Sequence, residues 1–124
     1  MWLLDTNILI HCNKLKIKPF RKDFTFTTIF SLIEFPIASK YTEISIVNPT
    51  SLHYNLSLKY ALMLRKKGTP IPAIDIITGA IAVEKNFYLV SEDSDFRYFQ
   101  DVEPRLKIIS LDNYIDNIQK KNQN

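Results

Sequence analysis

The hydrophobic positions of this chain fall into short apolar runs separated by longer segments with helical spacing. Four of the runs predict β-strands, at residues 2–4, 24–26, 87–90 and 107–109, because each is too short to form an independent helix. These runs do not alternate strictly between apolar and polar residues, which is typical of strands in a parallel sheet that is covered on both faces.

Helical segments are predicted between these strands. Asn48–Pro49 favours the first turn of a helix that continues to Gly68. A second helix is expected over residues 72–85, because the two prolines at its start disfavour helix further upstream. A last helix should follow Ser110 or Asp112. This alternation predicts an α/β fold with a mostly parallel central sheet of four to five strands flanked by helices.

Acidic residues directly follow two of the predicted strands. Asp5 comes after the first strand, and Asp93 and Asp95 come after the third. The carboxyl ends of parallel strands share one edge, where open α/β folds bind ligands, so we expect these acids to lie near one another. The alternative for Asp5 is an N-cap of a helix that starts near Asn7, and the alternative for at least one of Asp93 and Asp95 is a polar turn or cap.

Asp75 lies in the first turn of the helix predicted over residues 72–85. That helix is apolar nearly all round and is therefore expected to be buried. A carboxylate in a first turn gains only about 0.3 to 1 kcal/mol from the helix dipole, which is too little to offset burial. Asp75 therefore needs a charged partner, an opening to water or a cation.

Glu34 presents the same problem on a helix that we expect to be capped near Thr27 or Thr28, since its neighbours on that helix are mostly apolar. The purely structural alternative is a buried ion pair with a distant Lys or Arg. Pro36 should kink or end the helix just after Glu34, so that solvent or a metal ion can reach the carboxylate.

These acids together predict a metal centre. Two carboxylates ~4 Å apart repel by about 4 kcal/mol at an effective dielectric constant of 20, and a divalent cation removes that cost. Ligand sets made only of oxygen favour Mg²⁺ or Mn²⁺ over Zn²⁺. His11 and His53 have no metal-ligand spacing with each other or with Cys12, so we expect both to be structural or surface residues.

Composition is consistent with one folded domain. The chain has 124 residues, 46% apolar content and a single cysteine, which excludes an internal disulfide. We expect one domain over residues 1–124 with a frayed tail from about residue 120. The chain has no secretory signal and no apolar stretch long enough to span a membrane, so a cytoplasmic location is expected.

The net charge of +3 comes with two groups of basic residues, which suit a phosphate-bearing partner such as RNA. An ordinary solvated surface is the alternative. The candidate RNA-binding residues are Lys14, Lys16, Lys18, Arg21 and Lys22, then Arg65, Lys66 and Lys67, and Arg97 near the predicted metal centre.

Four segments of the chain resemble the PIN-domain family of metal-dependent ribonucleases, especially the small VapC-type toxins of toxin–antitoxin pairs. They are "LLDTNILI" at the N-terminus, "TTIFSLIEF" around Glu34, "PAIDIITGAIAVEKN" around Asp75 and "YLVSEDSDF" at Asp93. They occur in the order of the family and span nearly the whole chain. Pro36 departs from the family, in which the helix more often continues.

The resemblance implies a three-layer sandwich in which Asp5, Glu34, Asp75 and Asp93 are the catalytic and metal-binding acids. Asp95 is an additional candidate ligand, and Thr6, Asn7 and Ser91 are expected to lie beside the acids. The implied activity is Mg²⁺- or Mn²⁺-dependent endonucleolytic hydrolysis of RNA by a metal-activated water, with an antitoxin protein and a second copy of the chain as partners.

Two other functional classes remain open from the sequence. One is a PIN nuclease that processes RNA outside a toxin–antitoxin pair, and the other is a non-catalytic RNA-binding module on the same fold. A phosphotransfer domain fits poorly, because Asn7 stands where phosphatases of the haloacid dehalogenase type have a second acid.

Overall fold

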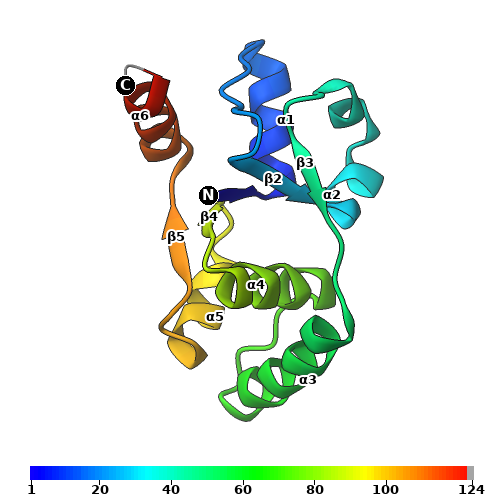
Figure 1. Cartoon of the computed structure of the whole chain (residues 1–124). Helices are drawn as coiled ribbons and strands as arrows, with labels where there is room; N and C mark the ends of the chain where they lie inside the picture. Colours follow the sequence, from blue (N-terminus) through cyan, green and yellow to red (C-terminus); the bar gives the residue numbers. More distant parts are fainter. Residues whose placement is uncertain (123–124) are drawn as a thin grey trace.

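A single five-stranded parallel sheet forms the centre of the computed structural model, which describes residues 1–122 (Figure 1). The strand order is β3-β2-β1-β4-β5, and every neighbouring pair is parallel. The strands are β1 (Trp2–Leu4), β2 (Thr25–Thr28), β3 (Ser45–Val47), β4 (Tyr88–Val90) and β5 (Lys107–Ile109). The predicted α/β class with four to five strands is confirmed.

Within residues 1–122 the chain forms six α-helices and one 3-10 helix, of which all but the last lie between strands. They are α1 (Thr6–Leu15), α2 (Ile29–Glu34), the 3-10 helix η1 (Pro36–Lys40), α3 (Ser51–Lys66), α4 (Ala73–Lys85), α5 (Asp95–Val102) and α6 (Leu111–Asn122). Helix α6 continues to Asn122, and the rest of the frayed tail expected from about residue 120 lies outside the described residues.

Helices cover both faces of the sheet and give it three layers. In Figure 1, α1 and α6 lie above the strands and α3, α4 and α5 lie below them. Leu3 and Leu89 pack into the core on the side of α3, α4 and α5, whereas Leu4 and Val90 pack into the core on the side of α1 and α6. The two-faced burial explains why the strand sequences are apolar without a strict period of two.

The carboxyl edge of the three central strands is where the chain places its polar side chains. Leu4 at the end of β1 pairs in register with Val90 of β4 and with Thr27 of β2. The chain leaves β1 and β2 directly into α1 and α2, and the segment after β4 leads into α5. Because β1 lies between β2 and β4, this edge is the topological switch point at which open α/β sheets bind ligands.

Two helices near that edge form for the reasons that the sequence indicates. Thr28 caps α2 by accepting a hydrogen bond from Ser31 N, and α2 ends at Glu34 before Pro36 starts the 3-10 helix. Helix α4 follows Pro72 as predicted and packs closely on α5, because Gly79 leaves room for the ring of Phe99.

Three local predictions differ from the structure. Strand β3 was not predicted, since its three residues at the edge of the sheet carry little apolar signal. Helix α3 is capped at Thr50 rather than at Asn48, because Thr50 and His53 form a reciprocal capping box. Strand β2 begins one residue later than expected and continues to Thr28.

A search of the described residues for a helix long and apolar enough to cross a membrane found none.

Candidate metal centre

An open pocket of about 560 Å³ lies at the carboxyl edge of the sheet, and all four acids of the predicted quartet line it. Asp5 comes from the end of β1, Glu34 from the last turn of α2, Asp75 from the first turn of α4 and Asp93 from the segment after β4. Residues that are up to 88 positions apart in the sequence therefore meet in one place, as the parallel sheet predicts. We call this pocket the acidic pocket.

Three carboxylates approach one another most closely within this region. Asp75, Asp93 and Asp95 each offer an oxygen, and these oxygens lie within 4.8 Å of one another. All three side chains are half-buried. A single cation can therefore contact all three carboxylates with only small side-chain movements.

Asp5 is held in a fixed orientation by several donors. Its Oδ1 accepts from Thr6 N at 2.9 Å, and its Oδ2 accepts from Ser91 Oγ at 2.8 Å and from Asn7 Nδ2 at 3.2 Å. Asp5 is also the N-cap residue of α1. The N-cap alternative is therefore confirmed, and the same carboxylate also lines the acidic pocket, while its role in metal binding stays a prediction.

Glu34 differs from the expectation that it is embedded among apolar residues, because its side chain is exposed. Pro36 ends α2 just after Glu34, so the last turn opens to solvent. Its Oε1 accepts a hydrogen bond from Thr6 Oγ1 at 3.0 Å, and Thr6 Oγ1 also lies 2.9 Å from Ser31 Oγ. Among the side chains that the structure describes Glu34 forms no ion pair with a Lys or Arg, and the exposure of Glu34 itself rules out the alternative of a buried salt bridge.

The segment after β4 is ordered by a short chain of hydrogen bonds. Asp93 N donates to Ser91 Oγ at 3.0 Å, and Asp95 N donates to Asp93 Oδ1 at 2.9 Å. The alternative of a polar turn therefore applies to one oxygen of Asp93, while Ser94 is the N-cap residue of α5. Ser91 joins this segment to Asp5, because its hydroxyl donates to the Asp5 carboxylate.

The electrostatics of the acidic pocket are unfavourable for the charged form of its acids. Burial and the neighbouring carboxylates of Asp5, Asp93, Asp95 and Glu34 raise the pKa of Asp75 to about 7. Burial also raises the pKa of Asp5, while the hydrogen bonds from Ser91 and Thr6 oppose this rise. Among the described residues that line the acidic pocket, none is a Lys or Arg. No basic side chain among these lining residues therefore compensates the negative charge of the acids.

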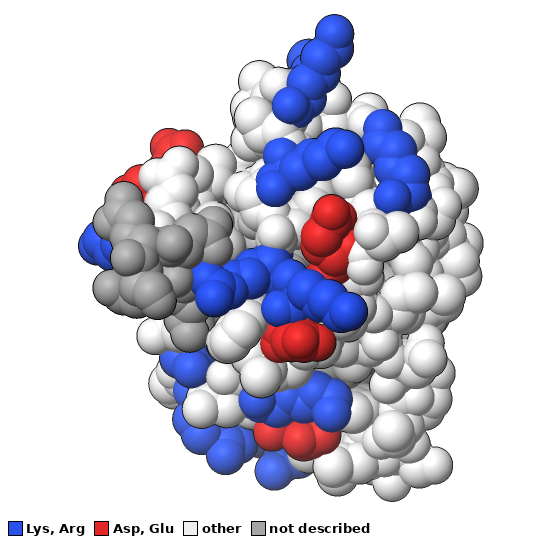
Figure 2. All heavy atoms as spheres, turned by 45° about the horizontal axis from the view of Figure 1, so that its top comes forward, with Lys and Arg blue, Asp and Glu red and all other residues white. Residues whose placement is uncertain are grey.

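The two groups of basic residues lie in different places. Helix α1 is ten residues long, about 15 Å, and the group from Lys14 to Lys22 lies at its far end from Asp5. Figure 2, in which the top of Figure 1 comes forward, shows several Lys and Arg side chains on this face, with Asp and Glu side chains interspersed among them. Arg65 instead lines a smaller pocket that shares Ala73 with the acidic pocket. Whether either group binds RNA stays a prediction.

The histidines are a surface residue and a core residue, as expected. His11 is exposed. His53 is only 1% exposed, and its Nε2 lies 2.9 Å from Glu84 Oε1. Sequence reasoning missed Ser31, which contacts Thr6 across 25 positions, because a single serine in a helix gives no signal of such a contact.

Comparisons with known proteins find similarity in structure alone. No family model and no curated protein matches the sequence. The fold matches VapBC-1 from nontypeable Haemophilus influenzae with a TM-score of 0.71 and 20% identity over 88% of this chain and 96% of that chain. It matches VapBC from Salmonella typhimurium, a DNA-bound structure, with a TM-score of 0.69 and 18% identity over 88% of this chain and 96% of that chain.

VapBC2 from Rickettsia felis, bound to a DNA fragment from its promoter, gives a TM-score of 0.67 and 17% identity over 88% of this chain and 97% of that chain. Nearly the whole of each matched chain is therefore covered, so the likeness extends over a complete domain of the VapBC structures. The five-stranded parallel sheet agrees with the three-layer architecture that the four sequence segments imply. The chain thus has the fold of a VapC-type PIN domain.

Proposed function

We propose that this protein is a divalent-metal-dependent endoribonuclease and the toxin of a toxin–antitoxin pair. The observation that carries the proposal is the approach of the Asp75, Asp93 and Asp95 carboxylates to within 4.8 Å of one another beside an open pocket. Folds alone do not determine activity, so the proposal depends on this site rather than on the likeness to VapBC structures.

The chemistry of the donor set fits Mg²⁺ or Mn²⁺. The three closest groups are all carboxylates, and neither His nor Cys lines the acidic pocket among the described residues. Hard divalent cations prefer such oxygen ligands. No described residue donates a hydrogen bond to the carboxylate oxygens of Asp75 or Asp95. These oxygens are therefore available to a cation. The raised pKa of Asp75 is a second sign that the site lacks a positive charge.

A bound Mg²⁺ or Mn²⁺ would lower the pKa of a water molecule and neutralise charge on the leaving oxygen of a phosphodiester. The protein holds the carboxylates in place for this task. Ser91 and Thr6 orient Asp5, and Thr6 also holds Glu34 at the mouth of the pocket. Asp93 and Asp95 are the candidates to accept the proton of the attacking water. Attack by water leaves 5′-phosphate and 3′-hydroxyl ends.

An antitoxin partner is part of the same proposal. The solved structures with this fold include complexes named as VapBC and as a toxin–antitoxin complex from Klebsiella pneumoniae. We expect a small partner protein to cover the acidic pocket or a neighbouring apolar surface, and we expect the cell compartment to be the cytoplasm, where RNA is available. A homodimer, which light scattering of the purified protein would detect, stays a prediction.

The test is cleavage of total RNA by the purified protein with Mn²⁺ and with EDTA, followed by sequencing of the new ends. We expect metal-dependent cuts that carry 5′-phosphates. Asp5→Asn and Asp75→Asn should each abolish cleavage while the circular dichroism spectrum stays native. Asp116→Asn, which makes the same change at an exposed position of α6, is the matched control and should cleave normally. Undiminished cleavage by Asp75→Asn, or cleavage in EDTA, would refute the proposal.

A further inference from the structure

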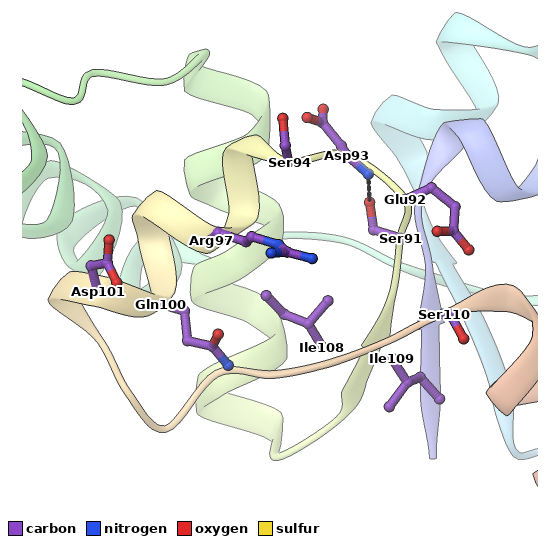
Figure 3. A pocket seen from close by; sticks show the side chains of 10 residues that line it. All are labelled: Ser91, Glu92, Asp93, Ser94, Arg97, Gln100, Asp101, Ile108, Ile109 and Ser110. Carbon is purple, nitrogen blue, oxygen red and sulfur yellow. Dashed lines mark hydrogen bonds between the residues drawn. The ribbon is translucent and has the colours of Figure 1, made fainter.

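A second open pocket, of about 580 Å³, lies directly beside the acidic pocket (Figure 3). Helix α5, the end of β5 and the segment after β4 form its walls. Asp93 lines both pockets, and Ser91 in this wall donates its hydroxyl to Asp5 and accepts from Asp93 N. A ligand in the second pocket would therefore lie next to a substrate or ion that is bound in the acidic pocket.

Arg97 brings a positive charge to this second pocket. It is the one Lys or Arg among the described residues that lines either pocket. Figure 3 shows its side chain extending from α5 over Ile108, while the carboxylate of Asp93 points away from it. In the described part of the chain the Arg97 guanidinium forms no ion pair, in contrast to Arg105, which pairs with Glu103. Its donors are thus available to a ligand.

The remaining walls of the second pocket combine an apolar surface, which suits a base, with polar groups that can form hydrogen bonds. Ile108 of β5, which lies on the α5 side of the sheet, forms an apolar wall, whereas Ile109 packs towards the opposite face. Gln100 donates its Nε2–H to Leu106 O at 2.8 Å, which fixes the amide and leaves its Oε1 as an acceptor. The hydroxyl of Ser110 also lines the pocket. The volume lies within the range of about 300 to 1,000 Å³ that is typical of small-ligand sites.

Two other acids line this pocket besides Asp93, and among the described side chains neither forms an ion pair with Arg97. The Oε1 atom of Glu92 accepts a hydrogen bond from Leu111 N at 2.9 Å, which directs this carboxylate towards the start of α6. Asp101 lies at the other end of the α5 face, as Figure 3 shows.

We propose that the second pocket binds one nucleotide of single-stranded RNA adjacent to the phosphodiester that is cut at the acidic pocket. Arg97 contacts the phosphate of this nucleotide, and the apolar side chain of Ile108 contacts its base. The RNA must be single-stranded there, because a base can enter a pocket only when it is unstacked from its neighbours. This inference rests on the proposed nuclease function, whose substrate it describes.

Binding is tested separately from cleavage, on metal-free protein in EDTA with a 5′-phosphorylated single-stranded RNA octamer and fluorescence anisotropy. Arg97→Gln should weaken binding about tenfold, the loss expected for one charged hydrogen-bonding contact. It should also lower the slope of log K against log salt concentration by about 0.7, the value for one phosphate contact on a single strand. Arg97→Lys, which keeps the charge, should stay within about threefold of the wild type.

The matched control is Lys59→Gln, which removes the same charge from an exposed position of α3 outside both pockets. It should change binding by less than twofold. Adenosine 5′-monophosphate should in addition shift the backbone amide resonances of residues 91–101 and 107–110 in the wild type and much less in Arg97→Gln.

Equal binding by Arg97→Gln and Lys59→Gln, or resonance shifts confined to other surfaces, would overturn the assignment of the second pocket even if the wild type cleaves RNA. Absence of metal-dependent cleavage by the wild type would instead overturn the proposed function, whatever the binding data show. The two failures are therefore distinguishable.

Discussion

Neutralising Asp75 should stabilise the metal-free protein, although this residue is central to the candidate metal centre. Asp75 accepts no side-chain hydrogen bond from the described residues, so Asp75→Asn loses no such contact. Burial and four nearby carboxylates raise its pKa from 3.8 to about 7. The folded protein therefore holds a proton on Asp75 more tightly than the unfolded chain does, and ionisation of this carboxyl group at higher pH destabilises the folded state.

The size of the effect follows from the two pKa values. A rise from 3.8 to about 7 corresponds to at most about 4 kcal/mol of unfolding free energy. Asp75 is only half-buried beside an open pocket, so we reduce this to about 1 to 2 kcal/mol for solvent screening. For a domain of this size that corresponds to an increase of roughly 4 to 8 °C in Tm.

The destabilisation caused by ionised Asp75 should increase with pH. Because the folded-state pKa is raised, the destabilisation is absent below the unfolded pKa of about 4, grows as the pH rises towards 7 and is complete above it. In EDTA, Asp75→Asn should melt higher than the wild type at pH 8 and at nearly the same temperature at pH 4.5. Differential scanning fluorimetry at both pH values measures the difference.

Asp116→Asn is again the control. Because Asp116 is exposed on α6, this substitution should change Tm by less than about 2 °C at either pH. A lower Tm for Asp75→Asn at pH 8 would show that Asp75 serves folding rather than ligand binding. A gain of equal size at pH 4.5 and pH 8 would show that charge is not its cause.

Three further outcomes are expected. Millimolar Mn²⁺ should raise the Tm of the wild type, because a ligand that binds only the folded state stabilises it; no shift would contradict a cation site. Thr6→Val removes the hydroxyl that donates to Glu34 and should lower the unfolding free energy by about 1 kcal/mol in urea titrations, whereas an unchanged value would show that this contact is not formed. Gly79→Ala should cost about 1 to 3 kcal/mol, because its Cβ would lie 2.7 Å from the fully buried Phe99 ring, and a stabilised variant would contradict this packing.

Most of the sheet could be predicted from the sequence because its central strands are buried on both faces. The apolar runs at β1, β4 and β5 coincide with the observed strands to within a residue. Strand β3 escaped prediction because it lies at the edge of the sheet, where one residue, Ile46, is half exposed and the apolar run is short. The strand order could not be predicted, since it depends on how helices pack across the faces.

The grouping of the acids could be predicted because parallel strands bring their carboxyl ends to one edge. This reasoning predicted that Asp5 lies near Asp93. The apolar helix around Asp75 indicated that Asp75 is a third acid of the site, and all three line the acidic pocket. For Glu34, the apolar neighbours on its helix predicted burial, whereas Pro36 predicted that the helix ends there and that solvent reaches the carboxylate. The second prediction is confirmed, since α2 ends at Glu34 and the side chain is exposed. The second pocket could not be predicted, since α5 meets β5 through contacts that no sequence pattern records.

Hydrogen bonding divides the acids of the candidate centre into two kinds, and this division explains why the site tolerates so much negative charge. Asp5, the N-cap residue of α1, accepts hydrogen bonds from Thr6, Asn7 and Ser91, and these donors partly compensate its charge. Asp75 lacks such donors and is the acid whose pKa rises to about 7. An apo protein near neutral pH therefore relieves the repulsion by protonating Asp75, and a cation that binds there has to displace that proton. Metal affinity should consequently fall as the pH is lowered through 7, and a calorimetric titration that finds the same Mn²⁺ affinity at pH 6 and pH 8 would contradict this account.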